Sequence, residues 1–226
     1  MSDAVMNDAV MNDAGMNAAG MNAALGAVIA GGLSSRFGSP KALVEVGGER
    51  VVDRVSAALR AALGHERIIC IANDPEIAAA IGLPSRADVM TGIGALGGVH
   101  AALLWAQERG CAGVLAAGCD MPFLAPALLR ALLTHAAGAD AVLPASDGPR
   151  GVEPLCAWYG TACIAAIEAA VHAGNTRMIG FHDRVRVVRL PLEEVKRYGE
   201  PARMFMNLNT PADRAEAERL AAVQDG

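Results

Sequence analysis

From Leu25 onward, short continuous apolar runs alternate with longer stretches in which apolar residues recur at helical spacing. The continuous runs predict strands at 25–30, 67–72, 113–118, 140–145, 154–159 and 184–190. The other stretches predict helices at 51–63, 75–81, 95–110, 125–136, 161–174 and 210–223. Strands that are apolar throughout are typical of a sheet buried on both faces, and intervening helices are typical of parallel connections. The pattern therefore predicts an α/β fold, a single three-layer domain with a mostly parallel central sheet.

The first 24 residues have a different pattern, a five-residue repeat that begins MSDAV MNDAV MNDAG. Its period matches neither a helix face nor a strand, and it offers no bulky apolar set to bury. We expect a flexible repeat tail at 1–24 and one domain at 25–226, because we find no linker that divides the chain after the tail. In a sheet of this kind, ligands bind beyond the carboxyl ends of the strands. The segments that follow residues 30, 72 and 118 fall at that edge.

Composition and charge exclude several kinds of partner. The chain has 226 residues, 53% of them apolar, and a formal net charge of −5, which argues against a protein that coats nucleic acid or an anionic membrane. The stretches 14–35 and 89–107 lack charged residues but contain asparagines or a glycine-rich segment, so neither predicts a membrane span. Five cysteines without a C-x-x-C pair favour a reducing compartment, and no cation precedes Arg36 as a secretory signal would require. We expect a cytoplasmic protein.

The first strand runs into a loop rich in glycine and cations. Gly31, Gly32 and Gly38 allow backbone N–H groups to approach an anion closely, while Arg36 and Lys41 offer a planar fork and a point charge for phosphate oxygens. The spacing fits neither the G-x-G-x-x-G fingerprint, nor a P-loop, nor a G-x-S-x-G nucleophile elbow. The segment indicates a loop that holds phosphates, and an ordinary glycine-rich turn is the alternative.

Two carboxylates outside this loop are further candidate site residues. Asp120 comes directly after the apolar run 113–118, where a carboxylate suits a Mg²⁺ ion that bridges substrate phosphates. A turn or capping role before Pro122 would also explain Asp120. Asp88 precedes the segment TGIGALGG and could accept two N–H bonds from the edge of a base, or could be a solvated turn residue.

The chain closes on an asparagine pair and a helix cap. Asn207 and Asn209 stand on one side of a short extended segment, where they could face the site, although Asn209 could equally be a turn residue. Thr210, Pro211 and Asp213 form a capping pattern that predicts the start of the last helix.

Taken together, the stretches IAGGLSSRFGSPKAL, AND, GALGG, GCDMP and NLNTPAD resemble the bacterial molybdenum cofactor guanylyltransferases, within the larger nucleotidyltransferase family. They occur in the family's order between about residue 25 and residue 222. The resemblance implies a Rossmann-like nucleotidyltransferase fold and Mg²⁺-dependent transfer of GMP from GTP to the molybdopterin phosphate of the cofactor, with release of pyrophosphate. It also implies, as further partners, a molybdoenzyme or a cofactor-delivery protein that receives the product.

The resemblance assigns roles to particular positions. In the nucleotide site it implies contacts from Ile29, Ala30, Gly31, Gly32, Lys41, Asn73, Asp88 and Asp120. Asp120 would also hold the metal, and Asn207 and Asn209 would lie near the reacting phosphates and the pterin. Lys41, Arg36, Asp120 and Asn209 would carry the chemistry. The attacking group is already an anion, so the protein would position two anions and neutralise their repulsion without a strong base.

The sequence also departs from the family pattern and leaves rivals open. Glu153 stands where relatives often have His or Gln, in a segment expected to face the second substrate. A CTP-dependent molybdopterin cytidylyltransferase is the nearest rival, because Asp88 suits the N–H donors of guanine and of cytosine. Sugar-1-phosphate nucleotidyltransferases share the loop but usually have longer chains. A non-catalytic nucleotide-binding regulator of the same fold is the rival from another class, and retention of Lys41 and Asp120 weighs against it.

Overall fold

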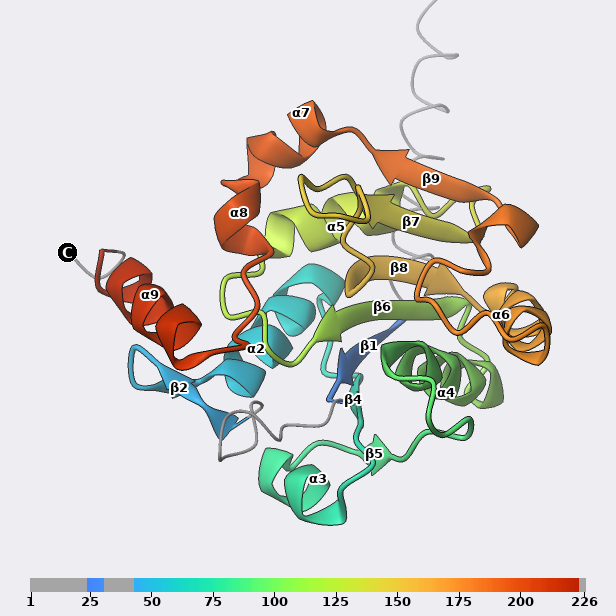
Figure 1. The fold of residues 1–226 in the computed structure, drawn as a ribbon, viewed down its shortest axis with the longest axis horizontal. Helices are drawn as coiled ribbons and strands as arrows, with labels where there is room; N and C mark the ends of the chain where they lie inside the picture. Colours follow the sequence, from blue (N-terminus) through green and yellow to red (C-terminus); the bar gives the residue numbers. More distant parts are fainter. Residues whose placement is uncertain (1–23, 31–42, 224–226) are drawn as a thin grey trace, which may run out of the picture.

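A seven-stranded sheet forms the centre of the molecule (Figure 1). The computed structural model describes residues 24–30 and 43–223, so residues 1–23 of the predicted repeat tail and the loop residues Gly31, Gly32, Arg36 and Lys41 lie outside the described residues. The strand order is β5-β4-β1-β6-β8-β7-β9. The strands are β1 (Ala24–Ile29), β4 (Ile68–Ile71), β5 (Ser85–Arg86), β6 (Gly113–Gly118), β7 (Ala141–Pro144), β8 (Cys156–Gly160) and β9 (Val187–Leu190).

The sheet is mostly parallel, as the pattern predicts, with one reversal. The strands β1, β4, β5 and β6 run in the same direction, and β7 pairs in parallel with β9. Strand β8 is antiparallel to both of its neighbours, β6 and β7. The connection 145–155 therefore lies at the carboxyl edge, where β6 and β7 end and β8 begins.

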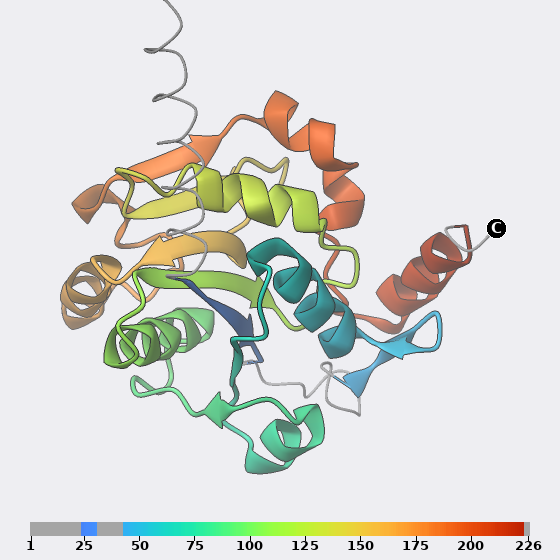
Figure 2. The ribbon, with the colours of Figure 1, turned by 180° about the vertical axis from the view of Figure 1, so that it is seen from behind.

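Helices cover both faces of the sheet, which gives the predicted three layers. Helices α4 (Ala95–Glu108) and α6 (Cys163–His172) cover the face that is nearer in Figure 1. Helices α2 (Val51–Leu63) and α5 (Pro126–Thr134) cover the opposite face, seen in Figure 2. The short helix α3 (Pro75–Ile81) lies beside the β5 edge.

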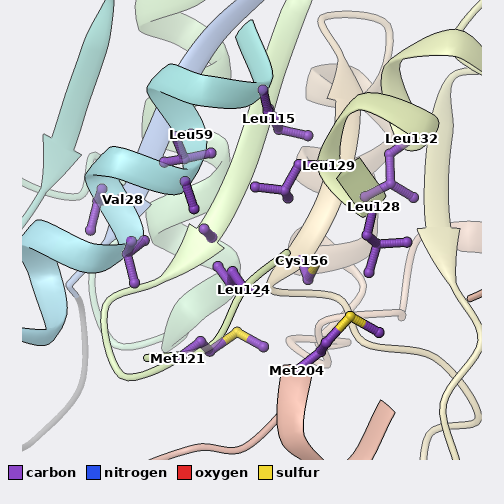
Figure 3. Close-up of a cluster of buried hydrophobic side chains, with 14 of the residues drawn as sticks. Val28, Leu59, Leu115, Met121, Leu124, Leu128, Leu129, Leu132, Cys156 and Met204 are labelled. Atoms are coloured by element: carbon purple, nitrogen blue, oxygen red, sulfur yellow. The ribbon is translucent and has the colours of Figure 1, made fainter. Parts of the chain in front are cut away.

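The hydrophobic core divides along the sheet because successive strand residues point to opposite faces. Val28 and Leu115 point toward α2 and α5, where they meet Leu59, Leu128 and Leu129 (Figure 3). The neighbouring strand residues Leu25, Ala27 and Ile29 belong to the cluster beneath α4 and α6. Full burial of a Leu or Ile side chain contributes about 1.5–3 kcal/mol to the free energy of folding. The two clusters therefore fix the positions of the strands and of the carboxyl edge at which they end.

The elements that the pattern misses are all short. They are β2 (Glu45–Val46), β3 (Glu49–Arg50), β5, the 3₁₀ turns η2 (His182–Arg184) and η3 (Lys196–Tyr198), α7 (Leu192–Val195) and α8 (Pro201–Met204). Segments of two to four residues contain too little of any period to be recognised. The last helix, α9 (Pro211–Ala222), begins with the predicted capping box at Thr210. None of the helices in the described ranges is long and apolar enough to cross a membrane.

Candidate active site

The carboxyl ends of the central strands are held in register. Ile29 at the end of β1 is the partner of Ile71 on one side and of Gly118 on the other. Beyond the strand, the Ala30 amide donates to the carbonyl of Ile71 at 2.8 Å, and the Cys119 amide donates to the carbonyl of Ile29 at 3.2 Å. Ile29 and Ala30 are thus fixed between the two segments that carry Asn73 and Asp120.

Asn73 and Asp88 form a reciprocal clamp. The Asn73 Nδ2 group donates to Asp88 Oδ2 at 2.9 Å, and the Asp88 backbone amide donates to Asn73 Oδ1 at 2.7 Å. The two residues are 15 positions apart in the sequence. Asn73 follows β4 and Asp88 follows β5, and the parallel pairing of these two strands brings the residues together. The structure therefore joins two residues that the resemblance assigns together to the nucleotide site.

The Asp88 carboxylate lies against the first turn of α4. A Cβ atom on Gly97 would stand 3.0 Å from Asp88 Oδ2 and 2.6 Å from the Met90 carbonyl oxygen, so this turn needs glycine for the close approach. Partial positive charge at the helix start favours a carboxylate there. Asp88 Oδ1 is buried and accepts no hydrogen bond from the described residues. An additional N–H donor would satisfy that oxygen.

Asp120 lies on the other side of β1, two residues beyond β6. Its side chain folds back over the strand end, where a Cβ atom on Gly118 would come within 2.9 Å of Asp120 Oδ1. Its carbonyl accepts a hydrogen bond from the Leu208 amide at 3.0 Å. This bond joins the asparagine segment near the chain end to the Asp120 turn.

The two asparagines have different surroundings. The half-buried Asn207 donates from Nδ2 to the Phe205 carbonyl at 2.9 Å. Asn209 is exposed, and its backbone amide donates to Asp213 Oδ2 at 2.8 Å, beside the Thr210 capping box. The Asn209 backbone thus takes part in the turn, and its position beside Leu208 keeps it near Asp120.

A cavity of about 360 Å³ opens between the connection 145–155 and the segment 201–207. Glu153 and Asn207 both line it. Burial raises the pKa of the Glu153 carboxyl group, while the bond from Leu155 and the charge of Arg150 lower it and the charge of Asp120 raises it. Asp120 and Glu153 therefore lie close enough for their charges to interact.

The sequence analysis does not predict this cavity. Glu153 enters that analysis as a departure from a family pattern, in a segment expected to face the second substrate. A carboxylate inside the apolar segment 152–159 was the available signal for a site residue. Phe205 and Pro201, which form the opposite wall, carry no such signal in the sequence.

The donor set at this edge fits a hard divalent cation. Mg²⁺ is usually held by one or two carboxylates, with waters and substrate phosphates as its other ligands. Asp120 supplies such a carboxylate, and a cation beside it would also offset the repulsion that Glu153 experiences. Within residues 24–30 and 43–223, no group of three or more His, Cys, Asp or Glu side chains gathers as a closed metal cage.

Comparisons with known proteins show which family the chain resembles. The family model described as "MobA-like NTP transferase domain" matches residues 26–186. A protein of Pelotomaculum thermopropionicum named "Probable molybdenum cofactor guanylyltransferase" is 35% identical over 198 residues, which cover 88% of this chain and 93% of that protein. A "Molybdenum cofactor guanylyltransferase" of Cereibacter sphaeroides is 34% identical, over 86% of this chain and 95% of its own. Among solved structures, the "Molybdopterin-guanine dinucleotide biosynthesis protein A" of Archaeoglobus fulgidus superposes with a TM-score of 0.72 and 28% identity, over 87% of this chain and 98% of that one.

Proposed function

The chain belongs to the MobA-like NTP transferase family, and from this premise we propose that it transfers GMP from GTP to the terminal phosphate of molybdopterin. An oxygen of the acceptor phosphate forms a bond to the α-phosphorus of GTP. The bond from that phosphorus to the bridging oxygen of the β-phosphate breaks, and pyrophosphate leaves with the electron pair. The nucleophile is already ionised, so the protein's task is to align two anions and offset their repulsion.

One observation carries the proposal: the sheet brings Asp88 and Asp120 to the same edge, on opposite sides of the end of β1. In our proposal the Asn73–Asp88 clamp binds the nucleoside, and the Asp88 carboxylate accepts from the N–H donors of the base. Ile29 and Ala30 contact the nucleotide between the two carboxylates. Asp120 faces the reacting phosphates.

The remaining phosphate contacts are assigned to the loop that follows β1. Gly31 and Gly32 would offer backbone N–H groups, and Arg36 and Lys41 would offer positive charge; these four residues lie outside the described part of the chain. Asn207 and Asn209 would lie between the phosphates and the acceptor. Asp120 would hold Mg²⁺, which when bound neutralises phosphate charge and orients the triphosphate.

The choice of guanine rests on the relatives. Asp88 suits the paired N–H donors of guanine, and it would also accept from the single amine of cytosine. Relatives at 35% and 34% identity are named guanylyltransferases, which favours GTP over CTP.

The test measures pyrophosphate release and dinucleotide formation by the purified protein with molybdopterin, Mg²⁺ and either GTP or CTP. We expect turnover with GTP, and we expect Asp120→Asn to lower kcat by roughly 10²–10³, the usual cost of one preorganised electrostatic contact. Asp183→Asn is the matched control, because it removes the same charge from the opposite edge of the sheet and should leave kcat unchanged.

Three results would contradict the proposal. Near-normal turnover by Asp120→Asn would remove Asp120 from the mechanism. A preference for CTP would make the enzyme a cytidylyltransferase. GTP binding without pyrophosphate release in the presence of molybdopterin would indicate a nucleotide-binding regulator.

A further inference from the structure

The cavity beside Glu153 lies apart from the Asn73–Asp88 clamp. It is formed by the connection between β7 and β8 and by residues around α8 (Figure 1). The clamp follows β4 and β5, on the far side of β1 and β6 in the strand order. The clamp and the cavity are therefore separate enough to bind two different molecules, such as the nucleotide donor and the acceptor.

The cavity is joined to the Asp120 turn by a short backbone path. Asn207 lines the cavity, and the next residue, Leu208, donates its amide to the Asp120 carbonyl at 3.0 Å. The raised pKa of Glu153 has the charge of Asp120 among its causes, which places both carboxylates around the same region. A molecule in the cavity can thus extend a phosphate toward Asp120.

The connection that carries Glu153 is held firmly. The Glu153 amide donates to the Pro144 carbonyl at 3.0 Å, and Ala145 pairs with Val152 in an antiparallel bridge. Farther along, the buried Tyr159 hydroxyl donates to the Pro154 carbonyl at 2.9 Å. These bonds fix the backbone on both sides of Glu153, so its side chain is presented from a rigid support.

The Glu153 carboxyl group has unused capacity to accept hydrogen bonds. Its Oε1 accepts from the Leu155 amide at 3.1 Å, and no hydrogen bond from the described residues reaches Oε2. A carboxylate has about four acceptor positions, so both oxygens can each take a further N–H bond. Two coplanar N–H donors side by side match this geometry, as in bidentate pairs.

The acceptor in the proposed reaction presents such a pair of donors. A pterin ring carries a 2-amino group next to the N3–H of its amide. A cavity of about 360 Å³ is within the usual size range of small-molecule sites. It is lined by the apolar Phe205 and Pro201 beside the polar Asn207 and Glu153, which suits a flat ring with one polar edge.

We propose that Glu153 binds the 2-amino and N3–H edge of the acceptor's pterin ring in this cavity, and so determines which acceptor the enzyme uses. The inference rests on the proposed function, because that function supplies a pterin acceptor. Glu153 touches the substrate at the end remote from the reacting phosphate, so it is a specificity residue. Its loss should act on acceptor binding and leave the nucleotide site intact.

The test uses the full chain and two fluorescent probes, pterin and lumazine. Lumazine has an oxo group where pterin has the 2-amino group, so it replaces a donor with an acceptor at the position that should face Glu153. We expect wild-type protein to bind pterin at least about tenfold more tightly than lumazine, the ratio for one hydrogen bond to a charged group. Glu153→Gln should lower that ratio by about tenfold, because its amide offers only one acceptor oxygen.

Glu193→Gln is the matched control. Glu193 lies on α7 with 82% of its side chain exposed and does not line the cavity, so the change removes the same charge without removing the half-buried acceptor. The binding ratio should not change in this variant. With molybdopterin as substrate, Glu153→Gln should raise the KM for molybdopterin and leave the KM for GTP as it is in the wild type.

An unchanged ratio in Glu153→Gln, or an equal fall in Glu193→Gln, would overturn the inference. So would the absence of pterin binding by the wild-type protein. These failures are distinguishable from failure of the proposed function. Transfer of GMP to molybdopterin without discrimination between the two probes would defeat the inference alone, whereas discrimination without GMP transfer would defeat the proposed function alone.

Discussion

At the scale of single residues, Glu153 illustrates how a buried site residue can lower the stability of the fold. Burial is the main cause of its raised pKa, and the charge of Asp120 acts in the same direction. A carboxyl group whose folded pKa lies above the unfolded value stabilises the fold at pH values below the unfolded pKa. That contribution is lost as the pH rises through the folded pKa. Because burial and the charge of Asp120 both disfavour the ionised form, a carboxylate at Glu153 is held in this position against a free-energy penalty.

We expect Glu153→Gln to be more stable than the wild type at pH 7–8. The gain should be roughly 2–4 °C in Tm, the change that about 1 kcal/mol produces in a domain of this size. The difference should shrink as the pH is lowered through the raised folded pKa of Glu153, and it should be gone below 4.5, the ordinary pKa of a glutamate. Thermal unfolding of both proteins across this range measures it, and an equal gain from the exposed Asp147→Asn would show that burial is not the cause.

The residue scale also shows what the sequence can and cannot predict about the site. Asp88 and Asp120 are selected from their own chemistry and Asn73 through the resemblance, and the structure places all three at one edge. The hydrogen bonds between Asn73 and Asp88 depend on β5, a two-residue strand that the pattern does not reveal. Glu153 is part of a cavity because 145–155 faces 201–207, and such contacts between distant segments have no local pattern.

At the scale of elements, the position of α4 depends on glycines in its first turn. A Cβ atom on Gly98 would stand 2.7 Å from Ile29 Cγ2, a branched side-chain atom that is packed in the core. The long helices and strands are predicted within a few residues, because each repeats its period several times. The sequence predicts a helix over 95–110, and the structure shows that two glycines of its first turn lie in close contact with the strand end and with Asp88.

We expect Gly98→Ala to destabilise the fold by about 1–3 kcal/mol, because the added methyl group overpacks the contact with Ile29. The higher helix propensity of alanine offsets at most about 1 kcal/mol. Chemical denaturation of the two proteins measures the difference. Gly148→Ala is the control, since its Cβ atom would meet only Ser146 Oγ at an ordinary 3.4 Å, and a comparable loss there would contradict this account.

At the scale of the whole molecule, the predicted layers and parallel sheet are confirmed, and the reversal at β8 is not foreseen. The residues 154–159 form a continuous apolar run, and such a run is equally compatible with either strand direction. Direction is decided by the connections: 145–155 contains no helix, so β7 and β8 join as antiparallel neighbours. A parallel connection would need a crossover of about a dozen residues or more.

Ligand binding should stabilise the molecule as a unit, because the proposed nucleotide contacts come from segments that follow β1, β4, β5 and β6. GTP at about 100 times its Kd should add about 2.7 kcal/mol to the free energy of unfolding, provided that Mg²⁺ is present. Thermal shift measurements with GTP alone, Mg²⁺ alone and both together test this. An equal shift by GTP with and without the metal would contradict a metal-bridged triphosphate.

The reversal at β8 also bears on how such enzymes diversify. Because the connection 145–155 returns directly to the sheet, it can change in sequence or length without moving any helix that packs on the two core clusters. The strand ends that carry Asn73, Asp88 and Asp120 lie in another part of the chain. Selection can therefore alter the acceptor pocket while the nucleotide-binding half is inherited unchanged. Enzymes for new acceptors can thus evolve with the same nucleotide donor.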